Sequence, residues 1–163
     1  MLRPATPADS PALVALAAAT GIFQPHEAEA LLGGVLGDLH DGRLGDGHQA
    51  QVWGDAPNGD PAGWVYFAPT PKADGVWDVG WIGVAPGRQK QGIGDALLGF
   101  VEAHVRAAGG RILTVETSSL PAFDPVRRFY AKRGYAECGR VPDFYADGDG
   151  KVIYSKRLAD RLV

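Results

Sequence analysis

Three side chains could carry acid–base chemistry: Asp78, Glu116 and Tyr130. The two acids stand on segments 76–84 and 111–116, whose β-branched, aromatic and apolar residues predict strands. A carboxylate can accept a proton from a bound group and a tyrosine hydroxyl can donate one, so these three side chains could act as bases and acid. On residue types alone, a core tyrosine is the favoured interpretation of Tyr130, and each acid could be a solvated strand end or part of a structural salt bridge.

A glycine-rich turn, Gln89-Lys90-Gln91-Gly92-Ile93-Gly94, follows the 76–84 strand and precedes a segment with helical spacing. Backbone N–H groups at a helix start can face one anion, and the helix dipole adds partial positive charge there. Gly92 and Gly94 let the backbone approach phosphate oxygens without a side-chain clash. By itself the turn is a weak signal, since a tight turn before a helix explains it too. The third glycine of a dinucleotide fingerprint and the Gly-Lys-Ser/Thr of a P-loop are absent from the sequence.

The composition indicates one globular domain, expected over residues 1–163. Sixteen basic and nineteen acidic residues give a net charge of −3, which argues against a general nucleic-acid binder. No apolar segment is long enough to span a bilayer. From the charge and from the lack of such a segment, we expect neither nucleic acid nor a membrane as a partner. The single cysteine, Cys138, and four histidines without shared spacing predict no metal site. The sequence shows no export signal, and the cytoplasm is the expected compartment.

Turn residues and periodicity divide the chain into about seven strands and about four helices. Helices are expected between Thr6 and Gly21 and at about 25–40, 92–108 and 125–133. Strands are expected at 2–5, 49–53, 62–67, 76–84, 111–116, 135–141 and 151–156. Meander strands sit beside one strand–helix–strand crossover, so the pattern predicts an α/β (α+β) fold. Its single mixed sheet is mostly antiparallel, and only the crossover strands are parallel.

Two motifs in this order resemble the GNAT superfamily of N-acetyltransferases. The first is Val84-x-Pro86, then Gln89-x-x-Gly92-x-Gly94 followed by Ala96-Leu97-Leu98, which looks like the acyl-CoA signature Q/R-x-x-G-x-G/A. The second is Phe129-Tyr130-Ala131-Lys132-Arg133-Gly134-Tyr135, which resembles F-Y-x-K-x-G-F/Y. The order of elements also matches over nearly the whole chain, so the resemblance implies the GNAT fold.

On the donor side, the resemblance implies acetyl-CoA as co-substrate and no metal. The sheet is expected to splay between its fourth and fifth strands, with pantetheine hydrogen-bonded to the fourth and the pyrophosphate on the backbone amides of the turn. The expected cofactor contacts are Ile82, Val84, Gln89, Lys90, Gln91, Gly92, Ile93, Gly94 and Tyr130. Strand alternation places Asp78, Gly80, Ile82 and Val84 on one face. A family asparagine before the second motif is missing here, and Ser118 or Ser119 is expected to replace its contact.

For the chemistry, the resemblance implies that Tyr130 is the acid at the CoA sulfur, as the tyrosine of the second motif is in related enzymes. The base stays open. Asp78 lies six residues before Val84, where some family members carry a catalytic glutamate. Glu116 is the other candidate, and it could instead bind the amine as a counter-ion. If neither acid acts, water alone accepts the proton.

On the acceptor side, the expected contacts are Phe23, Glu27, Glu116 and Tyr145, the last in a loop after a late strand. The predicted function is transfer of acetyl to a primary amine of a small molecule or peptide, by direct attack in a ternary complex. The net negative charge favours a cationic amine. A non-catalytic acyl-CoA-binding sensor or scaffold is the alternative. The oligomeric state stays open, with a homodimer as one expectation because many relatives pair through late strands.

Overall fold

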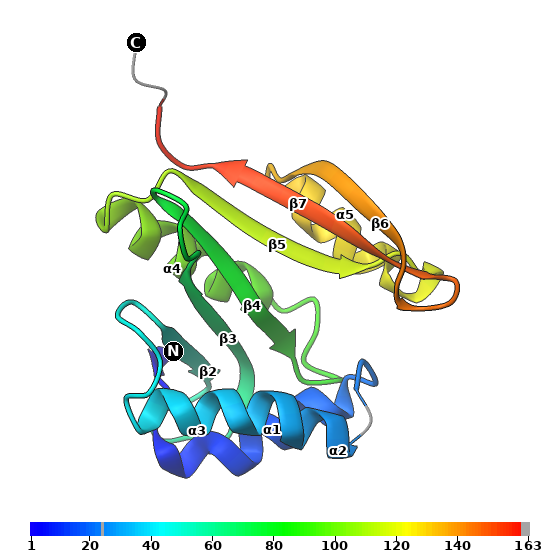
Figure 1. Ribbon diagram of the computed structural model, residues 1–163. Helices are drawn as coiled ribbons and strands as arrows, with labels where there is room; N and C mark the ends of the chain where they lie inside the picture. Colours follow the sequence, from blue (N-terminus) through cyan, green and yellow to red (C-terminus); the bar gives the residue numbers. More distant parts are fainter. Residues whose placement is uncertain (24, 161–163) are drawn as a thin grey trace. The chain divides into compact units, whose positions relative to one another are not determined.

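The computed structural model describes residues 1–23 and 25–160, in which seven strands form one mixed sheet (Figure 1). Contacts divide the chain into two compact units, Met1–Pro69 with Gly80–Ala103, and Thr70–Val79 with His104–Val163. The boundary crosses strand β4 (Val76–Val84) and helix α4 (Ile93–Ala107), so each unit holds part of both elements. Every helix within the described residues is too short or too polar to span a bilayer.

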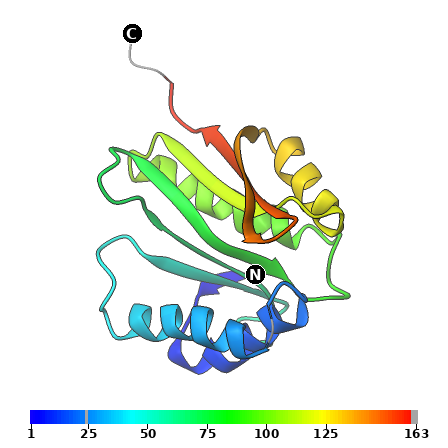
Figure 2. The ribbon, with the colours of Figure 1, turned by 45° about the vertical axis from the view of Figure 1, so that its right-hand side comes forward.

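The first unit combines three antiparallel strands with two helical segments. The strands are β1 (Leu2–Pro4), β2 (Gln49–Gly54) and β3 (Pro61–Pro69). The first helical segment is α1 (Ser10–Ala19), and the second consists of α2 (Pro25–Ala28), a π-helical turn η2 (Glu29–Gly33) and α3 (Gly34–His40). The two segments lie side by side in both views (Figures 1 and 2). The helices and strands share a core that includes Leu13, Leu36, Trp64 and Trp81.

A charged contact fixes the start of the first helical segment against β1. The Asp9 carboxylate, in the short 3₁₀ turn η1 (Pro7–Asp9), accepts the Thr6 N–H at 2.8 Å and two Arg3 guanidinium N–H groups at 2.7 Å each. The Arg3 guanidinium therefore holds the pKa of the Asp9 carboxyl well below its usual range. An acid in the first helical turn also meets the positive end of the helix dipole, so the Thr6-Pro7 helix start is confirmed.

The second unit is built on the paired ends of β4 and β5 (Ile112–Ser118). These strands are parallel, and their register runs only from Val76↔Ile112 to Val79↔Val115. The predicted splay between the fourth and fifth strands begins where this register ends. β5 then pairs along its whole length with the antiparallel strand β7 (Asp149–Arg157). Helix α5 (Asp124–Lys132) follows a 3₁₀ turn η3 (Pro121–Phe123) and contacts β6 (Ala136–Ala146).

The sheet order is β1-β2-β3-β4-β5-β7-β6, which agrees with the predicted mixed, mostly antiparallel sheet. β4 has the predicted bounds, but the expected loop around Tyr145 lies inside β6, which continues to Ala146. The β6–β7 register is irregular between Val141 and Ala146, and Asp143 has a φ of 56°. Pro142-Asp143 therefore produces an irregularity within the strand rather than its end, because the ladder resumes at Ala146↔Asp149.

Candidate active site

The turn between β4 and α4 has the backbone of an anion-binding loop. Lys90 and Gly92 have positive φ angles of 61° and 80°, whereas Gln89, Gln91 and Ile93 do not. Alternation between right- and left-handed conformations turns successive N–H groups toward one point and forms an anion-binding nest. The first turn of the fifteen-residue helix α4 follows directly, so the positive end of its dipole points to the same place. The residues present therefore fit a pyrophosphate.

A glycine on β3 determines how closely the first turn of α4 packs against the sheet. Ile93, the first residue of α4, is only 2% exposed. A Cβ added at Gly63 would lie 2.8 Å from Ile93 Cγ2 and 3.2 Å from Leu97 Cδ1, which is closer than ordinary van der Waals contact. The absence of a side chain at Gly63 lets α4 pack against β3. That packing holds the turn, whose other residues are largely exposed.

The two cations of the turn have different environments. The Arg88 guanidinium donates to both carboxylate oxygens of Asp55 at 2.9 and 2.8 Å, and its Nε donates to Gln91 Oε1 at 3.1 Å. Arg88 therefore ties the turn to the connection after β2, and it lowers the pKa of the Asp55 carboxyl by this hydrogen bond. Lys90 is exposed. Lys90 is thus the better placed of the two to meet an anion, since the charge of Arg88 is already compensated.

Strand β4 does not keep the strict alternation that the sequence predicts. A Cβ at Gly80 would meet the Tyr66 ring at 2.8 Å, and the ring of the next residue, Trp81, lies 5.9 Å from that of Trp64. Tyr66 and Trp64 are two residues apart on β3 and share a face, so Gly80 and Trp81 both point to it, as happens at a β-bulge. The expectation that Ile82 and Val84 share a face with Gly80 is therefore wrong.

Tyr130 lies in the interior of the second unit. Its side chain is 3% exposed, and its ring centroid is 5.5 Å from that of Phe129, 6.0 Å from Tyr135 and 5.7 Å from Tyr154. Burial raises the pKa of the Tyr130 hydroxyl well above its usual range, so it stays protonated. Within residues 1–23 and 25–160 this hydroxyl has no hydrogen-bond partner. It is a neutral donor without an acceptor.

Asp78 is held by a neighbour on β5. The Thr114 hydroxyl donates to Asp78 Oδ1 at 2.6 Å, and the two residues are direct partners in the parallel register. Burial raises the pKa of the Asp78 carboxyl, and the charge of Glu116 raises it further, while the hydrogen bond from Thr114 and the charge of Lys151 oppose the shift. A carboxylate with a raised pKa is a stronger base than a surface aspartate.

The Glu116 carboxylate pairs with a lysine that sequence reasoning missed. Lys151 Nζ lies 2.6 Å from Glu116 Oε2 and 4.4 Å from the centroid of the Phe144 ring. Tyr145, next to Phe144, has its hydroxyl pKa raised to about 12, first by burial and then by the charges of Glu116 and Asp149. Glu116 and Tyr145, two of the expected acceptor contacts, thus lie within electrostatic range of each other. The pairing of β7 with β5 was the missing information, since Lys151 lies on β7.

Tyr130, the candidate acid, and the two candidate bases lie on opposite faces of β5. Thr114, which contacts Asp78, is two residues from Glu116, so all three share one face. Val115 points to the other face and is paired with Tyr154, whose ring contacts Tyr130. A proton acceptor and a proton donor therefore flank this strand from its two sides.

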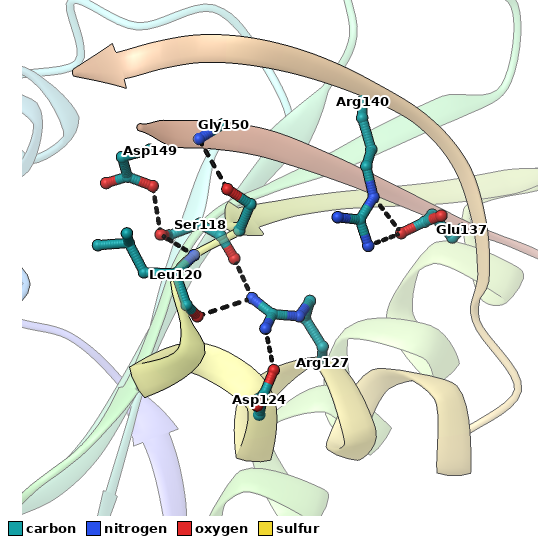
Figure 3. Close-up of polar contacts among 9 residues, drawn as sticks. Ser118, Leu120, Asp124, Arg127, Glu137, Arg140, Asp149 and Gly150 are labelled. Atoms are coloured by element: carbon teal, nitrogen blue, oxygen red, sulfur yellow. Dashed lines mark hydrogen bonds and ion pairs between the residues drawn. The ribbon is translucent and has the colours of Figure 1, made fainter. Parts of the chain in front are cut away.

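The loop from β5 to α5 is fixed by side chains that were considered as cofactor contacts (Figure 3). The Ser118 hydroxyl donates to Asp149 and accepts the Leu120 N–H at 3.0 Å. The Ser119 hydroxyl accepts the Gly150 N–H at 2.8 Å. Both serines join the loop to the start of β7. Their hydroxyls are engaged within the protein, so the structure gives no support to the expected replacement of the family asparagine.

Arg127 completes this anchor from the helix side. Its guanidinium donates to the carbonyl oxygens of Ser118 and Leu120 and pairs with Asp124 (Figure 3). Its side chain is 13% exposed. Arg127 thus holds α5, and with it Tyr130, on the end of β5.

The remaining acceptor candidates belong to the first unit. The Phe23 ring lies 5.6 Å from the Trp81 ring, and Glu27 is exposed on α2. Their meeting with Glu116 and Tyr145 of the second unit stays a prediction.

The sequence profile of the Acetyltransferase (GNAT) family matches residues 20–135. No curated protein matches the chain. Among solved structures, a protein of Desulfovibrio desulfuricans assigned to the GNAT family is 34% identical over 98% of this chain and 99% of its own, with a TM-score of 0.86. An aminoglycoside 6'-N-acetyltransferase complexed with coenzyme A is 19% identical over 100% and 99% of the two chains, with a TM-score of 0.76. The ribosomal-protein-S18-alanine N-acetyltransferase from Escherichia coli is 16% identical over 99% and 96%, also with a TM-score of 0.76. The last two likenesses concern the fold.

Proposed function

The chain belongs to the GNAT family of acetyltransferases, and on this premise we propose that it transfers an acetyl group from acetyl-CoA to a primary amine of a small molecule or peptide. The observation that carries the proposal is the backbone of the 89–93 turn, where positive φ angles at Lys90 and Gly92 alternate with ordinary ones at the start of α4. This nest is the part of the fold that is proposed to bind the acetyl donor.

The donor is bound chiefly by backbone groups. The N–H groups of residues 89–94 and the dipole of α4 hold the CoA pyrophosphate, and Lys90 adds a positive charge. Acetyl-CoA supplies a thioester, whose carbonyl carbon is open to attack and whose thiolate is a good leaving group. The aminoglycoside 6'-N-acetyltransferase of the same fold is complexed with coenzyme A. This supports an acyl-CoA donor for the present chain.

The acceptor is activated by Asp78. Its raised pKa makes the carboxylate a better match for the protonated amine, and the Thr114 hydroxyl fixes its orientation. Once deprotonated, the nitrogen attacks the thioester carbon and the C–S bond breaks, which leaves the acetyl group on a nitrogen that still has one proton to lose. The Tyr130 hydroxyl donates a hydrogen bond to the departing sulfur, and the proton lost from nitrogen reaches the thiolate by way of the solvent. The absence of another acceptor for this hydroxyl in the described residues supports that role.

The two faces of β5 support direct attack in a ternary complex. Asp78 and Glu116 share one face and Tyr130 lies on the other, so amine and thiolate are served from opposite sides. A thioester can be reached from both sides of a sheet only where neighbouring strands are not hydrogen-bonded. The end of the β4–β5 register at Val79↔Val115 meets this requirement.

The test is a thiol-release screen of wild-type protein with acetyl-CoA and a panel of amines. Amino acids, polyamines, aminoglycosides and peptides with an N-terminal alanine cover the acceptor classes, and Tyr130→Phe serves as the low-activity control. We expect thiol release that depends on both substrates and acetylated product by mass spectrometry. Binding of acetyl-CoA in calorimetry with no transfer to any amine would instead favour a non-catalytic acyl-CoA sensor or scaffold.

A further inference from the structure

We propose that Lys151 determines acceptor specificity: its ammonium group fills an alkylammonium position formed by Glu116 and Phe144, and it disfavours acceptors that carry a second positive charge. This inference rests on the proposed acetyl transfer, because it names the class of amine that the same site admits. The acceptor class that follows is a primary amine on a neutral or anionic body, rather than a polyamine.

The groups around Lys151 are those that recognise an alkylammonium ion. Its Nζ lies 2.6 Å from Glu116 Oε2, a charge-assisted contact, and 4.4 Å from the Phe144 ring centroid, within the range of a cation–π interaction. The Lys151 side chain is 20% exposed, whereas that of Glu116 is 42% exposed. Lys151 is therefore the more buried partner of the pair. The Glu116 carboxylate, which would otherwise attract a cationic substrate, already has its charge compensated by Lys151.

The strand pairing fixes Lys151 in this place. It lies opposite Ser118 on β5 and opposite Val141 on β6, so its backbone belongs to a strand with a partner on each side. Glu116 is two residues from Ser118 and shares its face, which makes Glu116 and Lys151 a diagonal pair across the two strands. The ammonium group is thus set by the sheet and is not on a mobile loop.

The charge of Lys151 acts on the proposed base as well as on Glu116. Both Glu116 and Lys151 influence the Asp78 carboxyl, with opposite signs, so the three groups lie within electrostatic range on one face of β5. An amine that reaches Asp78 brings the rest of its body near Lys151. A second ammonium group on that body meets a like charge instead of a free carboxylate. One charge interaction at a partly exposed site changes an equilibrium constant about tenfold.

The experiment compares hexylamine with hexamethylenediamine, which have the same length and differ by one ammonium group. The variants are Lys151→Met, which keeps the stem and removes the charge, and Lys151→Arg, which keeps the charge. The matched control is Lys156→Met on the same strand, because Lys156 points to the other face, where its Nζ donates to the Arg133 carbonyl and lies over the Tyr135 ring. Thermal unfolding of each variant is measured alongside the kinetics.

In Lys151→Met, we expect the ratio of kcat/KM for the diamine to that for the monoamine to rise about tenfold, mainly through a lower KM for the diamine. The ratio should change by less than about twofold in Lys151→Arg and Lys156→Met. A purely structural lysine would lower thermal stability and both activities without changing the ratio, and that result would overturn the proposal.

Glu116→Gln supplies a second, independent measurement that does not alter Lys151. It leaves the ammonium group uncompensated, so the ratio should fall, and an unchanged ratio in an active variant would contradict the inference. The two proposals fail differently. Wild-type protein that releases no thiol with any amine refutes the acetyl transfer, whereas active wild-type protein with the same ratio in all variants refutes only the role of Lys151.

Discussion

Replacement of Tyr130 by phenylalanine separates its chemical role from its role in packing. The substitution removes one oxygen atom from a side chain that is 3% exposed and leaves the ring against Phe129, Tyr135 and Tyr154. Because the hydroxyl has no hydrogen-bond partner among the described residues, its loss leaves no other polar group unsatisfied. We therefore expect the free energy of unfolding to stay unchanged or to rise by less than about 1 kcal/mol, so that Tm shifts by no more than roughly 2–4 °C in a chain of this size.

The effect on catalysis is expected to be opposite in direction. Loss of a general acid lowers kcat by roughly 10²–10⁴. Burial raises the pKa of the Tyr130 hydroxyl further above that of a free thiol, about 8.5, so complete proton transfer to the sulfur is uphill. The larger part of the effect is then a hydrogen bond to the developing thiolate, and we expect a decrease of about 10², at the low end of that range. KM for acetyl-CoA should change little, since the proposed pyrophosphate site is the turn at the start of α4 and does not include Tyr130.

The assay is thiol release at saturating acetyl-CoA and acceptor, with thermal unfolding of the same samples. Tyr154→Phe is the matched control, because Tyr154 is 6% exposed, lies on the same face and contacts the Tyr130 ring. Its kcat should stay within about twofold of wild type, as expected for a hydroxyl outside the chemistry. A Tyr130→Phe enzyme with wild-type kcat, or an equal loss in both variants, would refute the assignment of Tyr130 as the acid.

Three further changes test the base, the turn and the anchor. Asp78→Asn should lower kcat/KM at least tenfold. Since the pKa of the Asp78 carboxyl is raised in the folded protein, the stabilising contribution of this one group is fully present below its unfolded pKa of about 3.9 and is lost as pH rises through the folded value, so at neutral pH we expect the Asn variant to be more stable than the wild type in unfolding curves. Gly63→Ala must push back Ile93 by several tenths of an ångström and should cost roughly 1–3 kcal/mol and weaken CoA binding in calorimetry. Gly139→Ala is its control, since its Cβ would meet only Ile153 Cδ1 at 3.9 Å, and equal losses in both would contradict the packing argument. Arg127→Met should lower Tm by several degrees because two loop carbonyls lose their charged donor, and an unchanged Tm would show that the loop holds without it.

Local signals were enough to predict the turn and most elements. The 76–84 strand, the glycine-rich turn and the helix after it follow one another without interruption from Val76 to Ala107, so periodicity and glycine placement describe them directly. The positive φ angle at Gly92 is what a glycine there suggests. Lys90 also has a positive φ, which its residue type gives no reason to expect.

Features that depend on pairing between distant segments were not predictable in the same way. The Glu116–Lys151 pair follows from the β5–β7 register, and Arg88 meets Asp55 from 33 residues away. No local sequence pattern predicts that the members of these two ion pairs meet. The irregularity at Gly80-Trp81 also depends on β3, because only the contacts with Tyr66 and Trp64 show that two consecutive residues share a face.

The proposed acid and the proposed base lie on opposite faces of β5, so on this proposal the strand positions both groups. Alternation along β5 sends Thr114 and Glu116 to one side and Val115 to the other, so a change of one residue in its register would exchange the two environments. The parallel pair Asp78↔Thr114 and the antiparallel pair Val115↔Tyr154 fix that register from both neighbours. Asp78 is thereby positioned by its pairing with β5, and Tyr130 by the contact of its ring with Tyr154 on β7 together with the loop that Arg127 anchors. Tyr145, a proposed acceptor contact, lies on β6, which is an edge strand with β7 as its one neighbour in the described sheet, so we expect this side of the proposed site to be the one that adapts to different amines.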